Sequence, residues 1–120
     1  MAISSLSSEQ LGALRQTCAG IAIYVQVYGA AQTDEVRRLQ QRWGLPALPI
    51  EDVVQSARRR GRPDPLPVRQ TTIRYHMADA RACAEAIGQA QPAWRVEPLS
   101  ARLTPSPKTV EVWIAPPAGR

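Results

Sequence analysis

No hydrophobic run in the 120-residue sequence approaches the ~18 residues that a membrane-spanning helix needs. The N-terminus also lacks the basic start and the apolar core of a signal peptide. These absences predict a chain that does not insert into a membrane. As written it is expected in the cytoplasm, and it is expected in the periplasm or the envelope if it is cut from a longer exported protein.

Cysteine is almost missing, since the chain contains only Cys18 and Cys83. Each lies in a helical pattern beside alanines, where a free thiol behaves as a small buried hydrophobic group. Two cysteines do not make a disulfide framework, and a chain of this length can bury one core without one. We therefore expect two packed thiols rather than a bridge.

Catalytic and metal-binding patterns are also missing. The sequence has no glycine-flanked serine elbow, no paired carboxylates and no phosphate-binding glycine loop. Its single histidine, His76, precedes Asp79 by three residues, which is the one arrangement that could orient a proton-transferring imidazole. One histidine and two dispersed cysteines do not assemble a zinc site. We expect a non-catalytic protein without metal or cofactor.

Basic residues exceed acidic ones, fifteen against ten, and fourteen of the fifteen are arginine. Four of these arginines lie in QSARRRGRPDPLP, residues 55–67, whose glycine and three prolines are typical of a loop. Clustered guanidinium groups can clamp phosphate. No aromatic residue is interleaved with them to stack on bases, so a solvated loop is the favoured interpretation.

Secondary-structure signals fall into two similar halves. Residues 21–54 predict a strand, a helix capped by Thr33 or Asp34, and an edge strand over 47–54. Residues 71–115 predict a strand over 71–77, a helix ended by Gly88, a weaker strand over 93–99 and a closing strand over 109–115. Ser7 and Gln10 form a capping box at the start of a further helix before these halves.

Two such units sharing one sheet predict an α+β fold, specifically a ferredoxin-like βαββαβ sandwich with an extra N-terminal helix. Both helices of the units would then cover one face of the sheet. The expected division is an N-terminal helical appendage over 1–19, a single α+β domain over 20–115 with the arginine- and proline-rich loop at 55–67, and a disordered tail over 116–120.

The alternation of side chains predicts what lies on the other face. If the aliphatic residues of the strands face the helices, the aromatic and polar residues between them point the opposite way, Glu111 among them. The candidate binding residues are Tyr24, Gln26, Tyr28, Arg74, His76 and Trp113 on this face, with Arg58, Arg59 and Arg60 in the loop. The alternative is that the N-terminal helix, the long loop or a second copy of the protein covers the face.

Three stretches carry a resemblance to known families. IYVQVYGAAQTDEVRRLQQRWG, LPIEDV and TTIRYHMADARACAEAIG, within residues 21–115, resemble the C-terminal domain of LytR/CpsA/Psr-type cell-envelope proteins and, more distantly, the sporulation-related repeat that binds peptidoglycan glycan strands. The resemblance implies a bacterial, non-catalytic accessory module with a ferredoxin-like fold and a membrane-bound or enveloped partner. The chain departs from it by having no export signal and by carrying the arginine- and proline-rich loop.

Two functions of different classes remain from the sequence. The first is a protein-interaction or assembly module that uses the open sheet face or an edge strand to meet a protein partner or its own copy. The second is a glycan- or nucleic-acid-binding module that uses the same face and the loop, because rings stack on sugars and bases while amide and guanidinium groups supply hydrogen bonds. We favour the first.

Overall fold

The structure is a computed structural model that describes residues 6–43, 50–98 and 107–116. In chain order its elements are α1 (Ser8–Thr17), β1 (Ala22–Val27), α2 (Ala30–Trp43), β2 (Ile50–Asp52), α3 (Val53–Arg59), β3 (Thr72–Tyr75), the 3₁₀ turn η1 (Ala78–Ala80), α4 (Arg81–Ala90), β4 (Arg95–Pro98) and β5 (Thr109–Trp113). The predicted α+β class is confirmed. The predicted strand residues 47–49 and most of the predicted tail, residues 117–120, lie outside the described residues.

One mixed sheet of five strands in the order β2-β1-β5-β3-β4 organises the fold. Each strand–helix–strand unit pairs its own two strands directly and in parallel, β1 with β2 and β3 with β4. β5 joins the units, parallel to β1 and antiparallel to β3. The expected ferredoxin-like arrangement is not confirmed, since that fold splits each unit by a strand of the other, whereas here β5 alone lies between them.

The core lies between one face of this sheet and the helices. Alternate residues of the three central strands are buried there, with partners from α2 and α4. The sheet contributes Ile23, Val25, Val27, Ile73, Val110, Val112 and the following Ile114, and the two helices contribute Val36, Leu39, Cys83, Ala84 and Ile87. Both helices therefore cover the same face, as the sequence predicted.

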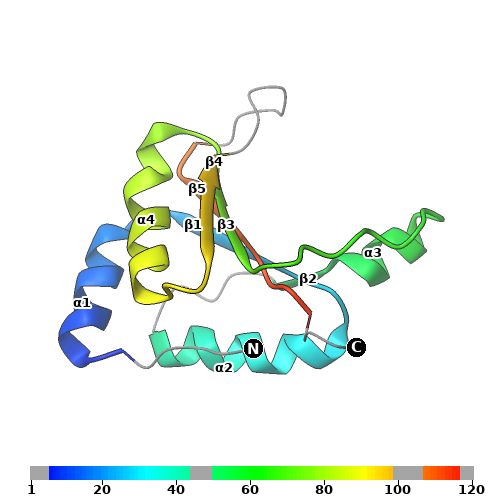
Figure 1. Ribbon diagram of the computed structural model, residues 1–120, viewed down its shortest axis with the longest axis horizontal. Coiled ribbons are helices and arrows are strands. Elements are labelled where there is room, and N and C mark those ends of the chain that lie inside the picture. Colours follow the sequence, from blue (N-terminus) through cyan, green and yellow to red (C-terminus); the bar gives the residue numbers. More distant parts are fainter. Residues whose placement is uncertain (1–5, 44–49, 99–106, 117–120) are drawn as a thin grey trace.

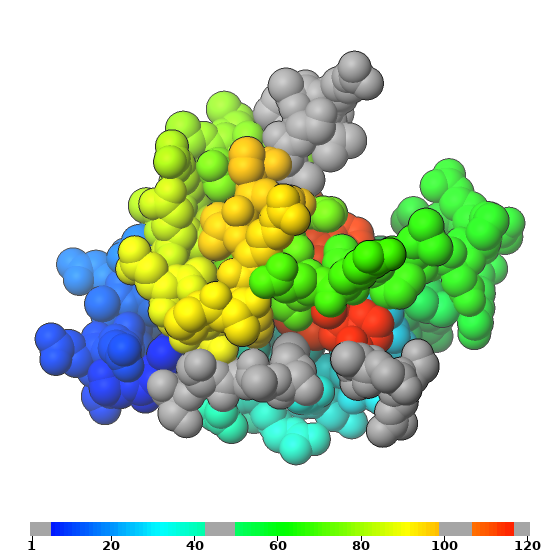
Figure 2. Space-filling model, viewed as in Figure 1, coloured from blue at the N-terminus to red at the C-terminus, as the bar shows by residue number. Residues whose placement is uncertain are grey.

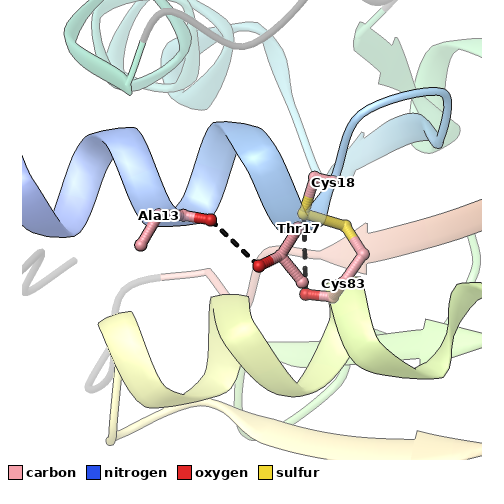
Figure 3. The surroundings of a disulfide bond; sticks show 4 residues. All are labelled: Ala13, Thr17, Cys18 and Cys83. Carbon is pink, nitrogen blue, oxygen red and sulfur yellow. Dashed lines mark hydrogen bonds between the residues drawn. A yellow bond between two sulfur atoms is a disulfide. The ribbon is translucent and has the colours of Figure 1, made fainter.

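A disulfide bond between Cys18 and Cys83 links α1 to α4 (Figure 3). The prediction of two free thiols was wrong. The two helices lie side by side (Figure 1), so residues that are 65 positions apart in the chain meet. The capping box of Ser7 and Gln10 is confirmed, and Leu14 joins the core from α1. The helix predicted as an appendage thus contributes to the one core of the domain.

The predicted loop over 55–67 is wrong in its first half. Strand β2 ends at Asp52, whose side chain accepts hydrogen bonds from the Val54 and Gln55 amides and so caps α3. Gln, Ser, Ala and Arg then continue the helix to Arg59, because all of them tolerate helical geometry and the prolines begin only at Pro63. Arg58 and Arg59 therefore lie in the last turn of a helix that projects from the sheet (Figure 1).

Two helix boundaries also differ from prediction. Helix α2 begins at Ala30, before the expected caps Thr33 and Asp34, and Gln32 lies in its first turn. The buried Gln32 side chain accepts from the Tyr28 amide and donates to the Ala115 carbonyl, which ties the ends of β1 and β5 to this turn.

Gly88 does not end α4, which continues to Ala90. A Cβ atom at position 88 would lie 2.5 Å from Val96 Cγ2. The glycine is therefore needed for the close approach of α4 to β4 rather than for a turn.

We expect Gly88→Ala to lower the free energy of unfolding by about 1–2 kcal/mol, because overpacking against the stiff Val96 side chain outweighs the gain in helix propensity. Gly12→Ala in α1 is the matched control, since no atom lies within 4 Å of its added Cβ, and it should stabilise by about 0.5–1 kcal/mol. Urea unfolding of both variants measures the difference. Equal effects at the two positions would contradict the close packing of α4 on β4.

Candidate functional site

The face of the sheet opposite the helices carries two rows of aligned side chains. Strand register places Tyr24, Glu111, Arg74 and Glu97 in one row across β1, β5, β3 and β4. It places Glu51, Gln26, Trp113, Thr72 and Arg95 in the next row. Tyr28 directly follows β1, two residues after Gln26, and His76 directly follows β3, two residues after Arg74. We call the set Tyr24, Gln26, Tyr28, Arg74, His76, Glu97, Glu111 and Trp113 the aromatic face.

Glu111 lies at the centre of the aromatic face and holds two of its rings. Its Oε1 accepts a hydrogen bond of 2.9 Å from the Trp113 indole Nε1, and its Oε2 lies 3.0 Å from His76 Nε2. The His76 side chain is 9% exposed and that of Glu111 is 22% exposed. Both side chains are thus held in place before any partner arrives.

Arg74 completes the centre from the neighbouring strand. Its Nε donates to Glu97 Oε1 over 2.9 Å, and its guanidinium carbon lies 5.3 Å from the centroid of the Trp113 ring, within reach of a cation–π interaction. Tyr28 also lies beside that indole, with ring centroids 6.3 Å apart and planes tilted by 45°. Tyr24 is 39% exposed, so one ring of this surface remains open to solvent.

Tyr28 links the aromatic face to the segment that follows α3. Its hydroxyl oxygen accepts a hydrogen bond of 3.3 Å from the Val68 amide. Burial raises the pKa of Tyr28 above its ordinary value, more than the Val68 hydrogen bond and Arg74 lower it. The phenol is therefore neutral at physiological pH, and the segment is attached at the margin of the face.

The six candidate residues predicted on the face are placed together by the strand register, and three of them pair with two carboxylates. Glu111 was expected on this face but not as the group that orders it. Glu97 was missed, because β4 is a weak strand signal that ends at Pro98. The alternation of Arg95, Val96 and Glu97 was the one signal that could have placed it.

The three candidate arginines lie elsewhere. Arg58 and Arg59 are on α3, which follows the edge strand β2, and Arg60 caps that helix. Arg58 donates to both carboxylate oxygens of Asp64, at 3.1 and 3.0 Å, and these hydrogen bonds lower the pKa of Asp64. The helix projects away from β3 and β4 (Figure 1), so these arginines and Arg74 belong to different surfaces.

The one arrangement that could orient a proton-transferring imidazole, His76 with Asp79, does not form. His76 contacts Glu111 rather than Asp79, whose carboxylate accepts from the Lys108 amide. The chain has no thiol nucleophile, because both of its cysteines are in the disulfide. Within residues 6–43, 50–98 and 107–116, no group of three His, Cys, Asp or Glu side chains could hold a metal ion.

Comparison with known proteins adds no identification: no family model, no curated protein and no solved structure matches the chain. Among the helices that the structure describes, none is long and apolar enough to cross a membrane.

We expect Glu111→Ala to lower the free energy of unfolding by about 1–2 kcal/mol, because the Trp113 and His76 donors lose their shared acceptor. Glu51→Ala is the control, an exposed carboxylate in the adjacent row, and it should change stability by less than about 0.5 kcal/mol. Urea unfolding followed by circular dichroism measures both. If the two variants unfold alike, Glu111 does not order the face.

Proposed function

We propose that this chain is a non-catalytic assembly module that binds a second copy of itself through the aromatic face. The supporting observation is that the charged groups of the face already have partners, Glu111 with Trp113 and His76, and Arg74 with Glu97. A partner that covers the face therefore buries ring surface without leaving these charges unpaired, which would be costly. Trp, Tyr and Arg are also the residue types that carry most of the binding energy in protein interfaces.

Two features favour the open face over the edge strands. Within the described residues, edge strand β2 spans three residues before α3 begins, and edge strand β4 ends at Pro98. Short edges and proline disfavour the addition of a further strand. Nucleic acid is disfavoured on the same face, because Glu97 already pairs with both Arg74 and Arg95, which are the guanidinium groups that would otherwise meet a phosphate backbone there.

A glycan is the second candidate ligand, and one observation favours it. Gln26 Oε1 is buried on the aromatic face and accepts no hydrogen bond within the described part of the chain. A buried acceptor without a donor is costly, and a sugar hydroxyl can donate to such a group while its ring stacks on Tyr24 or Trp113. The resemblance to envelope modules points to the same ligand class.

Light scattering distinguishes these candidates. We expect the wild-type chain to have twice the mass of one chain, and Trp113→Asp to be a folded monomer, because a charge at the centre of the face would be buried unpaired. Met77→Asp is the control, since Met77 is 41% exposed and lies outside the aromatic face. It should dimerise like the wild type.

A wild type that is monomeric at all concentrations would overturn self-assembly, as would a Trp113→Asp variant that keeps the dimer. In the first case soluble glycans are the next ligands to test on the wild type and on Trp113→Asp. Glycan binding through stacking should change little with salt, in contrast to phosphate binding by arginine.

The disulfide supports the second of the two predicted locations, the periplasm or the envelope. Disulfides persist in oxidising compartments and are rare in the cytosol, where thioredoxin and glutathione keep thiols reduced. The bridge is also buried, with Cys18 4% and Cys83 1% exposed.

Thiol labelling of the chain taken directly from its cells tests this location. We expect no alkylated cysteine when the label is added in denaturant without reductant, and two after reduction, because the bridge forms in the native compartment. Mass spectrometry counts the labels. Two labels without reductant would place the working protein in a reducing compartment.

A further inference from the structure

The segment between α3 and β3 presents an apolar side chain to solvent on a stiff support. In residues 62–67, RPDPLP, every second residue is proline. Proline fixes its own φ, and the residue before a proline is restricted to extended conformations. Each of the six residues therefore has a restricted backbone conformation, and we call this segment the proline strap. It runs across the front of the molecule in Figure 2 (green).

Both ends of the proline strap are held by the domain. At the start, the Arg62 amide donates to the Ala57 carbonyl, and Asp64 forms its two-point ion pair with Arg58. At the end, the Val68 amide donates to the Tyr28 hydroxyl. Little conformational entropy is left to lose when such a segment binds.

Leu66 lies between the last two prolines of the proline strap and is 91% exposed, against 39% for Tyr24 and 41% for Met77. A single exposed leucine is common on protein surfaces and lowers the stability of the fold little. Held out on an extended, proline-rich support, however, it has the form of the peptides that dock in grooves lined by aromatic rings.

The chain itself carries a surface of that kind. The aromatic face offers the rings of Tyr24 and Trp113 beside the carboxylate of Glu111. Together with the adjacent row it carries the carboxylates of Glu51, Glu97 and Glu111 against the guanidinium groups of Arg74 and Arg95, a net charge of −1 from these five side chains. The proline strap is flanked by arginines of the opposite charge, exposed at positions 59, 60, 62 and 69. The high exposure of Leu66 shows that the strap does not bury this side chain on its own domain.

We propose that the proline strap of one copy binds the aromatic face of a second copy, with Leu66 and its flanking prolines on the rings of Tyr24 and Trp113. The inference rests on the proposed function and names the occupant of that site. The strap joins the margin of the aromatic face at Tyr28. A two-fold axis near this residue therefore places the strap of each copy on the aromatic face of the other copy. Both contacts then form at once.

A synthetic peptide of residues 61–69, GRPDPLPVR, tests the contact on the intact protein. The peptide should lower the mass of the wild-type dimer to that of one chain in light scattering, because it competes for the aromatic face. The same peptide with Leu66→Asp is the control and should leave the dimer intact. In the full chain, Leu66→Asp should weaken dimerisation at least about tenfold, as loss of an interface anchor does, with an unchanged fold because Leu66 is exposed.

The outcomes separate the two proposals. If Trp113→Asp is monomeric but Leu66→Asp dimerises like the wild type, the aromatic face is the interface and the strap is not its occupant. If neither variant changes the dimer, both proposals are wrong. A monomeric wild type that binds the peptide, and loses it with Trp113→Asp, supports the contact between strap and face. A monomeric wild type that does not bind the peptide overturns it.

Discussion

Pairing of β5 with β1 on one side and β3 on the other is the interaction on which the rest of the structure depends. Each strand–helix–strand unit closes on itself through its own parallel pair, and β5 is the strand that joins the two units into one sheet. The side chains of β5 alternate between the two faces of the sheet. Val110 and Val112 enter the core, while Glu111 and Trp113 form the centre of the aromatic face.

The same topology places α2 and α4 on one face of the sheet and the side chains of the aromatic face on the other. α2 and α4 both pack on the buried side, and α1 is fastened to α4 by the Cys18–Cys83 bridge. With α1, α2 and α4 on one side, several charged and aromatic side chains on the opposite side contact each other. Glu111 accepts from Trp113 and contacts His76, and Arg74 lies between Glu97 and the indole ring.

At the two cysteines and at Gly88, where the sequence prediction was wrong, a contact distant in sequence decided the outcome. Nothing near Cys18 or Cys83 indicates that their helices pack together, so a bridge over 65 positions was not foreseen. Gly88 has the local pattern of a helix stop, yet its role is the approach of α4 to Val96 on β4. A local contact decided the third difference: the strand predicted over 47–54 ends at Asp52, whose side chain accepts from the Val54 and Gln55 amides and begins α3.

Local periodicity was enough to determine the central strands, the helix after each opening strand, and the residues that share the aromatic face, because alternation along a strand is a property of the backbone. Tyr24, Gln26, Arg74 and Trp113 could therefore be grouped from the sequence. Strand order, the disulfide, and the pairing of Glu111 and Glu97 with their partners were decided only by the tertiary structure. They depend on which strands become neighbours, and that choice rests on contacts between distant residues that no local pattern encodes.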